Sequence, residues 1–101
     1  MSVLMTFRIA GDPDKLEQLA AERGDVLRAI RDRAVESGLI THRFYGAEGQ
    51  IMVLDEWPDP ESFQRFYESQ RGEIEPMMQQ VATGEPEITF RCKLETGDDL
   101  G

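Results

Sequence analysis

The sequence predicts an α+β fold in which helices cover one face of a four-stranded antiparallel sheet, in the order β-α-β-β-α-β. Three observations predict this fold. Apolar side chains alternate along the first and last segments, they recur at helical spacing after two Asp-Pro pairs, and a glycine-containing turn separates two strand-like runs. At 101 residues the chain has the size of one domain.

The first strand and the first helix meet at Asp12-Pro13. Before this point, alternating apolar residues predict a strand over 3–9. Asp12 suits an N-cap and Pro13 suits the first helical position. The apolar spacing that follows predicts one long amphipathic helix that Gly38 ends, with Gly24 as a point where a bend or an interruption can occur.

The middle of the chain predicts a hairpin and a second helix. Residues 39–45 and 50–57 read as strands joined by the turn 46–49. Asp59 and Pro60 repeat the capping pattern and start a helix with an aromatic stripe. We expect this helix to break near Arg71-Gly72, because Pro76 is tolerated only in the first turn of a further helical piece.

The last strand is predicted from strict alternation over 87–94. Cys92 falls on its apolar face, where burial would make the thiol inert. We expect one domain over residues 1–94 and an acidic, mobile tail over 95–101.

Composition excludes several classes of partner. The net charge of −9 repels nucleic acids and anionic membranes, and no apolar run approaches the roughly 20 residues of a membrane helix. The N-terminal residues lack the pattern of a signal peptide, so we expect a cytoplasmic protein. One cysteine and one histidine provide neither a disulfide nor a metal site.

Both faces of the predicted strands carry large apolar side chains. Ile51 and Val53 oppose Met52 and Leu54 on one strand, for example. Helices on one side of the sheet would leave the other face in water, beyond the apolar area that soluble monomers usually expose. We therefore expect a homodimer that forms through the sheet faces.

Three stretches carry a resemblance to a known family: the sequence GLITHRFY over 38–45, IMVLDEW over 51–57 and PESFQRF over 60–66. Together they resemble the antibiotic biosynthesis monooxygenase superfamily, over residues 3–94. The resemblance implies a ferredoxin-like domain that pairs into a dimeric α/β barrel. Cofactor-independent members oxidise electron-rich polycyclic phenols with oxygen, since the substrate supplies its own electrons.

For this chain the resemblance implies a monooxygenase-like protein without a cofactor, acting on a small aromatic or quinone-like metabolite. A non-catalytic dimeric module that binds a small apolar ligand or a partner protein stays open as the alternative. Members that degrade haem use an asparagine on the first strand and a histidine on the second helix. This chain has no asparagine and no histidine there, so haem degradation is disfavoured.

Two residues are candidates for catalysis. The resemblance places Trp57 beside the pocket, although an aromatic residue at a strand end also serves as a packing anchor. His42 is the one side chain whose ordinary pKa suits a base near neutral pH, although a lone histidine is often a hydrogen-bonded structural residue.

Five further residues are candidates for contact with a substrate. Asp55 shares a strand face with Trp57 and would enter the pocket, unless it forms a salt bridge to Arg43 or Arg8 across the sheet. The other four are aromatic, and two of them carry hydroxyls able to steer a phenol: Phe7, Phe44, Tyr45 and Tyr67.

Overall fold

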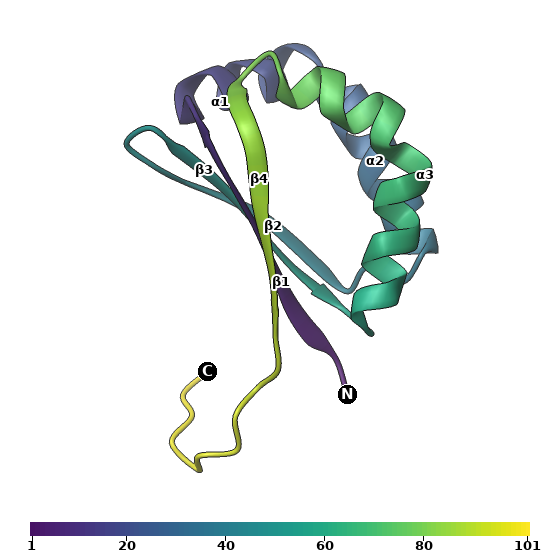
Figure 1. Ribbon diagram of the computed structural model, residues 1–101, viewed down its shortest axis with the longest axis vertical. Helices are drawn as coiled ribbons and strands as arrows, with labels where there is room; N and C mark the ends of the chain where they lie inside the picture. The colour runs from purple at the N-terminus through teal and green to yellow at the C-terminus, as the bar shows by residue number, and fades with distance from the viewer.

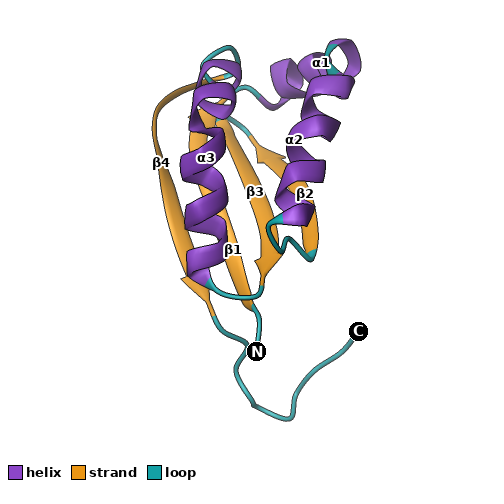
Figure 2. Ribbon diagram, turned by 90° about the vertical axis from the view of Figure 1, so that its right-hand side faces the viewer, coloured by secondary structure: helices purple, strands orange, loops and turns teal.

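The computed structural model describes residues 1–101 as a ferredoxin-like α+β domain. Its elements are β1 (Val3–Gly11), α1 (Pro13–Glu22), α2 (Gly24–Glu36), β2 (Thr41–Ala47), β3 (Gln50–Trp57), α3 (Pro60–Met78) and β4 (Ala82–Arg91). The strands form one antiparallel sheet in the order β2-β3-β1-β4, and the helices lie on one side of it (Figure 1, Figure 2). The predicted fold class is confirmed.

The face of β1 that meets the helices supplies much of the core. Val3, Met5, Phe7 and Ile9 are all buried, and the residues between them are exposed or half-buried. Because side chains alternate between the two faces of a strand, this pattern fixes which face the helices cover. No strand residue that points to the opposite, outer face is buried.

The predicted long first helix is wrong as one element, since it is divided into α1 and α2. Arg23 has φ −127° and ψ 34°, outside the helical region, and Gly24 begins α2. The interruption predicted at Gly24 is therefore confirmed. It lets α2 take a different direction from α1 and cross behind α3 (Figure 1).

The predicted break in the second helix is wrong, because α3 runs unbroken to Met78 with Pro76 inside it. Pro76 lies in the last turn, and its missing N–H costs the helix one backbone hydrogen bond, to the carbonyl of residue 72. Met78 is buried, and Ile74 and Met77 pack against the core. This burial offsets the cost of about 1 kcal/mol that Gly72 adds inside a helix.

The last strand begins at Ala82, five residues before the predicted start, and ends at Arg91. Its pairing with β1 shifts register between Arg8 and Ala10. Cys92 lies beyond the strand and is exposed, so its predicted burial is wrong. None of the helices has the length and apolar character needed to cross a membrane.

The N-terminus of α3 is capped by Asp59. Its carboxylate accepts hydrogen bonds from the Ser62 hydroxyl and the Ser62 backbone N–H, both at 2.8 Å. These bonds, the hydroxyl first, hold the pKa of Asp59 below the ordinary 3.8. The cap connects the end of β3 to the helix that covers it.

Asp59→Ala is expected to lower the melting temperature by several degrees, because it leaves a helix N–H without a partner. Asp59→Asn keeps a hydrogen-bond acceptor at the cap and is expected to lower the melting temperature less than Asp59→Ala does. A lowered folded-state pKa means that the carboxylate stabilises the fold above pH 3.8 and loses this effect as the pH falls through the folded value. Thermal unfolding at several pH values checks both points. Equal melting temperatures for wild type and Asp59→Ala at neutral pH would contradict the capping role.

Candidate functional site

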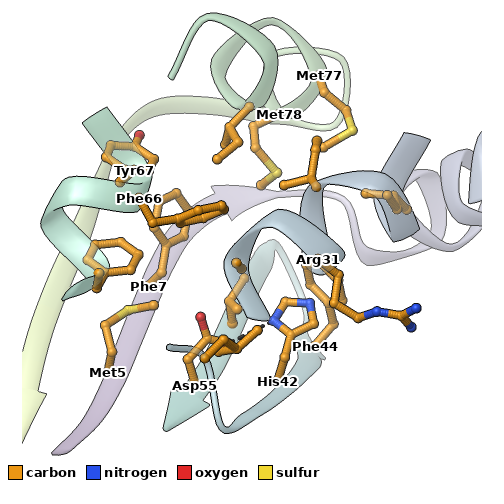
Figure 3. A pocket seen from close by; sticks show the side chains of 17 residues that line it. Met5, Phe7, Arg31, His42, Phe44, Asp55, Phe66, Tyr67, Met77 and Met78 are labelled. Atoms are coloured by element: carbon orange, nitrogen blue, oxygen red, sulfur yellow. Dashed lines mark hydrogen bonds and ion pairs between the residues drawn. The ribbon is translucent and has the colours of Figure 1, made fainter. Parts of the chain in front are cut away.

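An apolar cavity of about 110 Å³ lies between the sheet and helices α2 and α3, which is room for more than one water molecule. Of its 17 lining residues 14 are hydrophobic, and the three others are Arg31, His42 and Asp55. Figure 3 shows His42 and Asp55 side by side at one end of the cavity, with the guanidinium of Arg31 directed outward. Arg31 pairs there with Asp32 at 3.3 Å.

His42 and Asp55 face each other directly across the β2-β3 pair. The two side chains point to the helix-covered face, and His42 Nδ1 lies 2.7 Å from Asp55 Oδ1. The Asp55 side chain is 7% exposed and the His42 side chain 27%. A mostly buried carboxylate is thus joined to an imidazole that keeps access to the cavity.

Asp55 lines the cavity, and the alternative that the sequence left open for it, a salt bridge to Arg43 or Arg8, does not form. Strand alternation sends both arginines to the outer face, away from Asp55. Arg8 pairs instead with Glu87 at 3.0 Å. The partner of Asp55 is His42.

Trp57 lies next to this pair but does not line the cavity. Its indole has no exposed surface and packs against Phe63 and Phe66, with ring centroids 5.7 Å and 5.6 Å away. Its Nε1–H donates to Asp55 Oδ2 at 3.1 Å. In this conformation Trp57 lies behind the cavity wall, because the two phenylalanines of α3 stand between it and the cavity, and it has the packing that the alternative of an anchor at the strand end describes.

Three of the four predicted aromatic contacts line the cavity, namely Phe7, Phe44 and Tyr67. The fourth, Tyr45, follows Phe44 on β2 and so points to the outer face, where it is 48% exposed. Its predicted place in the pocket is wrong. Phe44 also contacts the imidazole of His42 edge to face, at 4.9 Å between centroids.

Two side chains of α3 contact the ring of Tyr67. Phe63 stacks on one face at 5.5 Å, and the guanidinium of Arg71 lies 5.3 Å from the ring centroid. Burial, helped by Glu75 and Glu85 and opposed by Arg71, raises the pKa of Tyr67 above the ordinary 10.0. The phenol is therefore a neutral hydroxyl at physiological pH.

Sequence reasoning missed the wall that α2 contributes. Four residues of this helix line the cavity: Leu27, Ile30, Arg31 and Ala34. Their spacing places them on one helix face, which was a signal for burial but not for a cavity. No cluster of three or more histidine, cysteine or acidic side chains is placed to hold a metal ion.

The raised pKa of Tyr67 gives a direct test of the packing around it. In Tyr45→Phe, Tyr67 is the sole tyrosine, and its ionisation by ultraviolet absorbance is expected above pH 10.0. Adding Glu75→Gln is expected to lower the midpoint, because a nearby negative charge is removed. The pKa of Tyr67 is higher in the folded than in the unfolded state. The folded state therefore keeps its full stability below pH 10.0 and loses stability as the pH rises through the folded-state pKa of Tyr67. A midpoint at or below 10.0 would show that Tyr67 is solvated.

The similarity of this chain to known proteins lies in its structure. No family model and no curated protein matches the sequence. A monooxygenase from Streptomyces coelicolor, from the gene ActVA-Orf6 and solved with the ligand nanaomycin D, matches the structure with a TM-score of 0.70 and 15% identity, over 94% of this chain and 89% of that one. SnoaB from Streptomyces nogalater, a cofactor-independent oxygenase, matches with a TM-score of 0.63 and 16% identity, over 94% and 95% of the two chains.

A dimeric ferredoxin-like protein from an uncultured marine organism matches with a TM-score of 0.65 and 16% identity, over 93% of this chain and 89% of that one. Further matching structures are antibiotic biosynthesis monooxygenases at 8% and 7% identity, the second of them from Nitrosomonas europaea and named as putative. Identities this low establish the fold. The chain therefore has the fold of the antibiotic biosynthesis monooxygenase superfamily, as its sequence resemblance implied.

Proposed function

We propose that this protein is a cofactor-independent oxygenase that acts on a small phenolic or quinone-forming aromatic metabolite in the cavity, with His42 as the base. One observation carries the proposal: a single histidine-carboxylate pair lies at the wall of an otherwise apolar cavity. The pair is the type of proton acceptor that general base catalysis uses.

The walls of the cavity suit an aromatic ligand. Phe7, Phe66 and Tyr67 present ring surfaces, and Met5, Met77 and Met78 add flexible side chains that adapt to different ring systems. Such walls exclude water around a bound ring and hold it in one orientation. The hydroxyl of Tyr67 points away from His42 and Asp55 (Figure 3), so Tyr67 contributes its ring to the wall and leaves proton transfer to His42.

The proposed chemistry needs one proton acceptor and dioxygen. His42 takes the phenolic proton, and the resulting phenolate is electron-rich enough to reduce oxygen. At an activated CH₂ group the overall change is CH₂ + O₂ → C=O + H₂O, in which all electrons come from the substrate and the proton on His42 returns to the water formed. The structural likeness to SnoaB and to the Streptomyces coelicolor monooxygenase supports this class of reaction at the level of fold.

His42→Gln is expected to slow oxygen consumption with a panel of polycyclic phenols by about 10²–10⁴-fold, the usual contribution of a general base. Arg28→Gln, on the exposed side of α2 and outside the cavity, is the matched control and is expected to keep the wild-type rate. An oxygen electrode gives the measurement. Saturable quenching of Trp57 fluorescence by these phenols, with no oxygen consumed, would refute the oxygenase and favour a binding module.

We propose further that two chains pair through the outer face of the sheet. Leu4 and Tyr45 are 46% and 48% exposed on this face, and Met52 and Leu54 lie half-buried between them. No helix lies on this side of the sheet (Figure 1). The neighbour from an uncultured marine organism, which is dimeric and ferredoxin-like, supports pairing of two chains. Two-fold pairing of one face with itself would bury this surface.

Light scattering is expected to return twice the chain mass of 11.5 kDa. Leu54→Lys places a charge in the middle of the outer face, opposite Thr6 and Arg43, and is expected to yield the monomer mass. Val35→Lys changes an apolar side chain that is 55% exposed on α2, and is expected to leave the dimer intact. A monomer mass for the wild type at micromolar concentration would contradict the pairing.

A further inference from the structure

We infer that Asp55 and Trp57 are positioning residues that fix the tautomer of His42, so that the proton of its ring sits on Nδ1 and Nε2 is the free acceptor. The inference deepens the proposed function and rests on it for its catalytic meaning, because a base must present an unprotonated nitrogen to the substrate. It assigns to Trp57 a role through Asp55 in place of the expected contact with a ligand.

The hydrogen-bond directions follow from what each group is able to do. The indole of Trp57 has one N–H and no acceptor, so Asp55 Oδ2 must accept from it at 3.1 Å. An ionised carboxylate accepts only, so Oδ1 must also accept from its partner at 2.7 Å, which is His42 Nδ1. In the neutral imidazole one nitrogen donates and the other accepts. Nε2 is then the acceptor.

The direction in which the imidazole points agrees with this assignment. Nε2 lies on the edge of the ring away from Asp55, on the side of Arg31 (Figure 3). The charged and titratable groups that line the cavity around the ring are Asp55 from β3, Arg31 from α2 and Tyr67 from α3. Arg31 is turned outward to Asp32, and Tyr67 is neutral, so Asp55 is the one anionic group of the lining.

Trp57 fixes the orientation of the carboxylate because it cannot move. It is fully buried and packs against two phenylalanine rings of α3, two residues after Asp55 on the same face of β3. The fixed N–H reserves Oδ2, which leaves Oδ1 directed at the histidine. If residue 55 were an amide, the same N–H would hold its oxygen and turn its NH₂ toward His42.

The tautomer of His42 tests this constraint, because Asp55 and Trp57 would not change the tautomer if their roles were purely structural. His42 is the sole histidine, so nitrogen-15 NMR of labelled protein reports its tautomer without assignment. At alkaline pH, without ligand, wild type is expected to show the Nδ1–H form. Asp55→Asn is expected to invert it to Nε2–H, because the amide NH₂ donates to Nδ1. Asp55→Asn combined with Trp57→Phe frees the amide to rotate, and the Nδ1–H form is expected to reappear.

Phe66→Leu is the matched control, because it loosens the packing around Trp57 and removes neither hydrogen bond. It is expected to keep the Nδ1–H form, and amide spectra of each variant verify the fold. An Nε2–H form in wild type, an unchanged tautomer in Asp55→Asn, or no recovery in the double variant would overturn the inference. These readings need no substrate, so they stand or fall separately from oxygen consumption.

Discussion

The buried carboxylate of Asp55 is the constraint on which the site depends. A carboxylate removed from water needs hydrogen-bond donors or a counter-charge, or it destabilises the fold. Asp55 has two hydrogen-bond donors, and both are side chains on the same sheet face: the indole of Trp57 on its own strand and the imidazole of His42 on the neighbouring strand. The pair of bonds ties the end of β3 to β2 and keeps a polar group at the edge of an apolar cavity.

The one-sided arrangement of the helices explains why a cavity exists there. The inner sheet face must fill the space under both α2 and α3, and its side chains are large near α3, where Phe63, Phe66 and Trp57 pack together. The cavity lies between these side chains and α2, and the half-buried Val53 of β3 is part of its lining. The same one-sidedness leaves the outer face to a second chain, so the site and the proposed dimer have a common origin in the topology.

The sequence was sufficient where a single local rule decides the outcome. Alternation found β1, the turn at 46–49 marked the hairpin that contains β3, and the Asp-Pro pairs marked the first residues of α1 and α3. It failed where tertiary packing outweighs local preference, as in α3, which continues through Gly72 and Pro76. Strand parity put Asp55 on the helix-covered face, but the partner of Asp55 depends on the register of the β2-β3 hairpin. The burial of Trp57 depends on α3, which no local pattern places.

The proposed reaction requires that a ligand hydroxyl meets His42 Nε2 inside the cavity. A crystal structure of the protein with a naphthol bound under anaerobic conditions measures this contact directly. We expect a hydroxyl oxygen within about 2.6–3.2 Å of His42 Nε2, with the rings against Phe7 and Phe66. A naphthol bound on the outer sheet face, or a cavity that stays closed at saturating ligand, would contradict it.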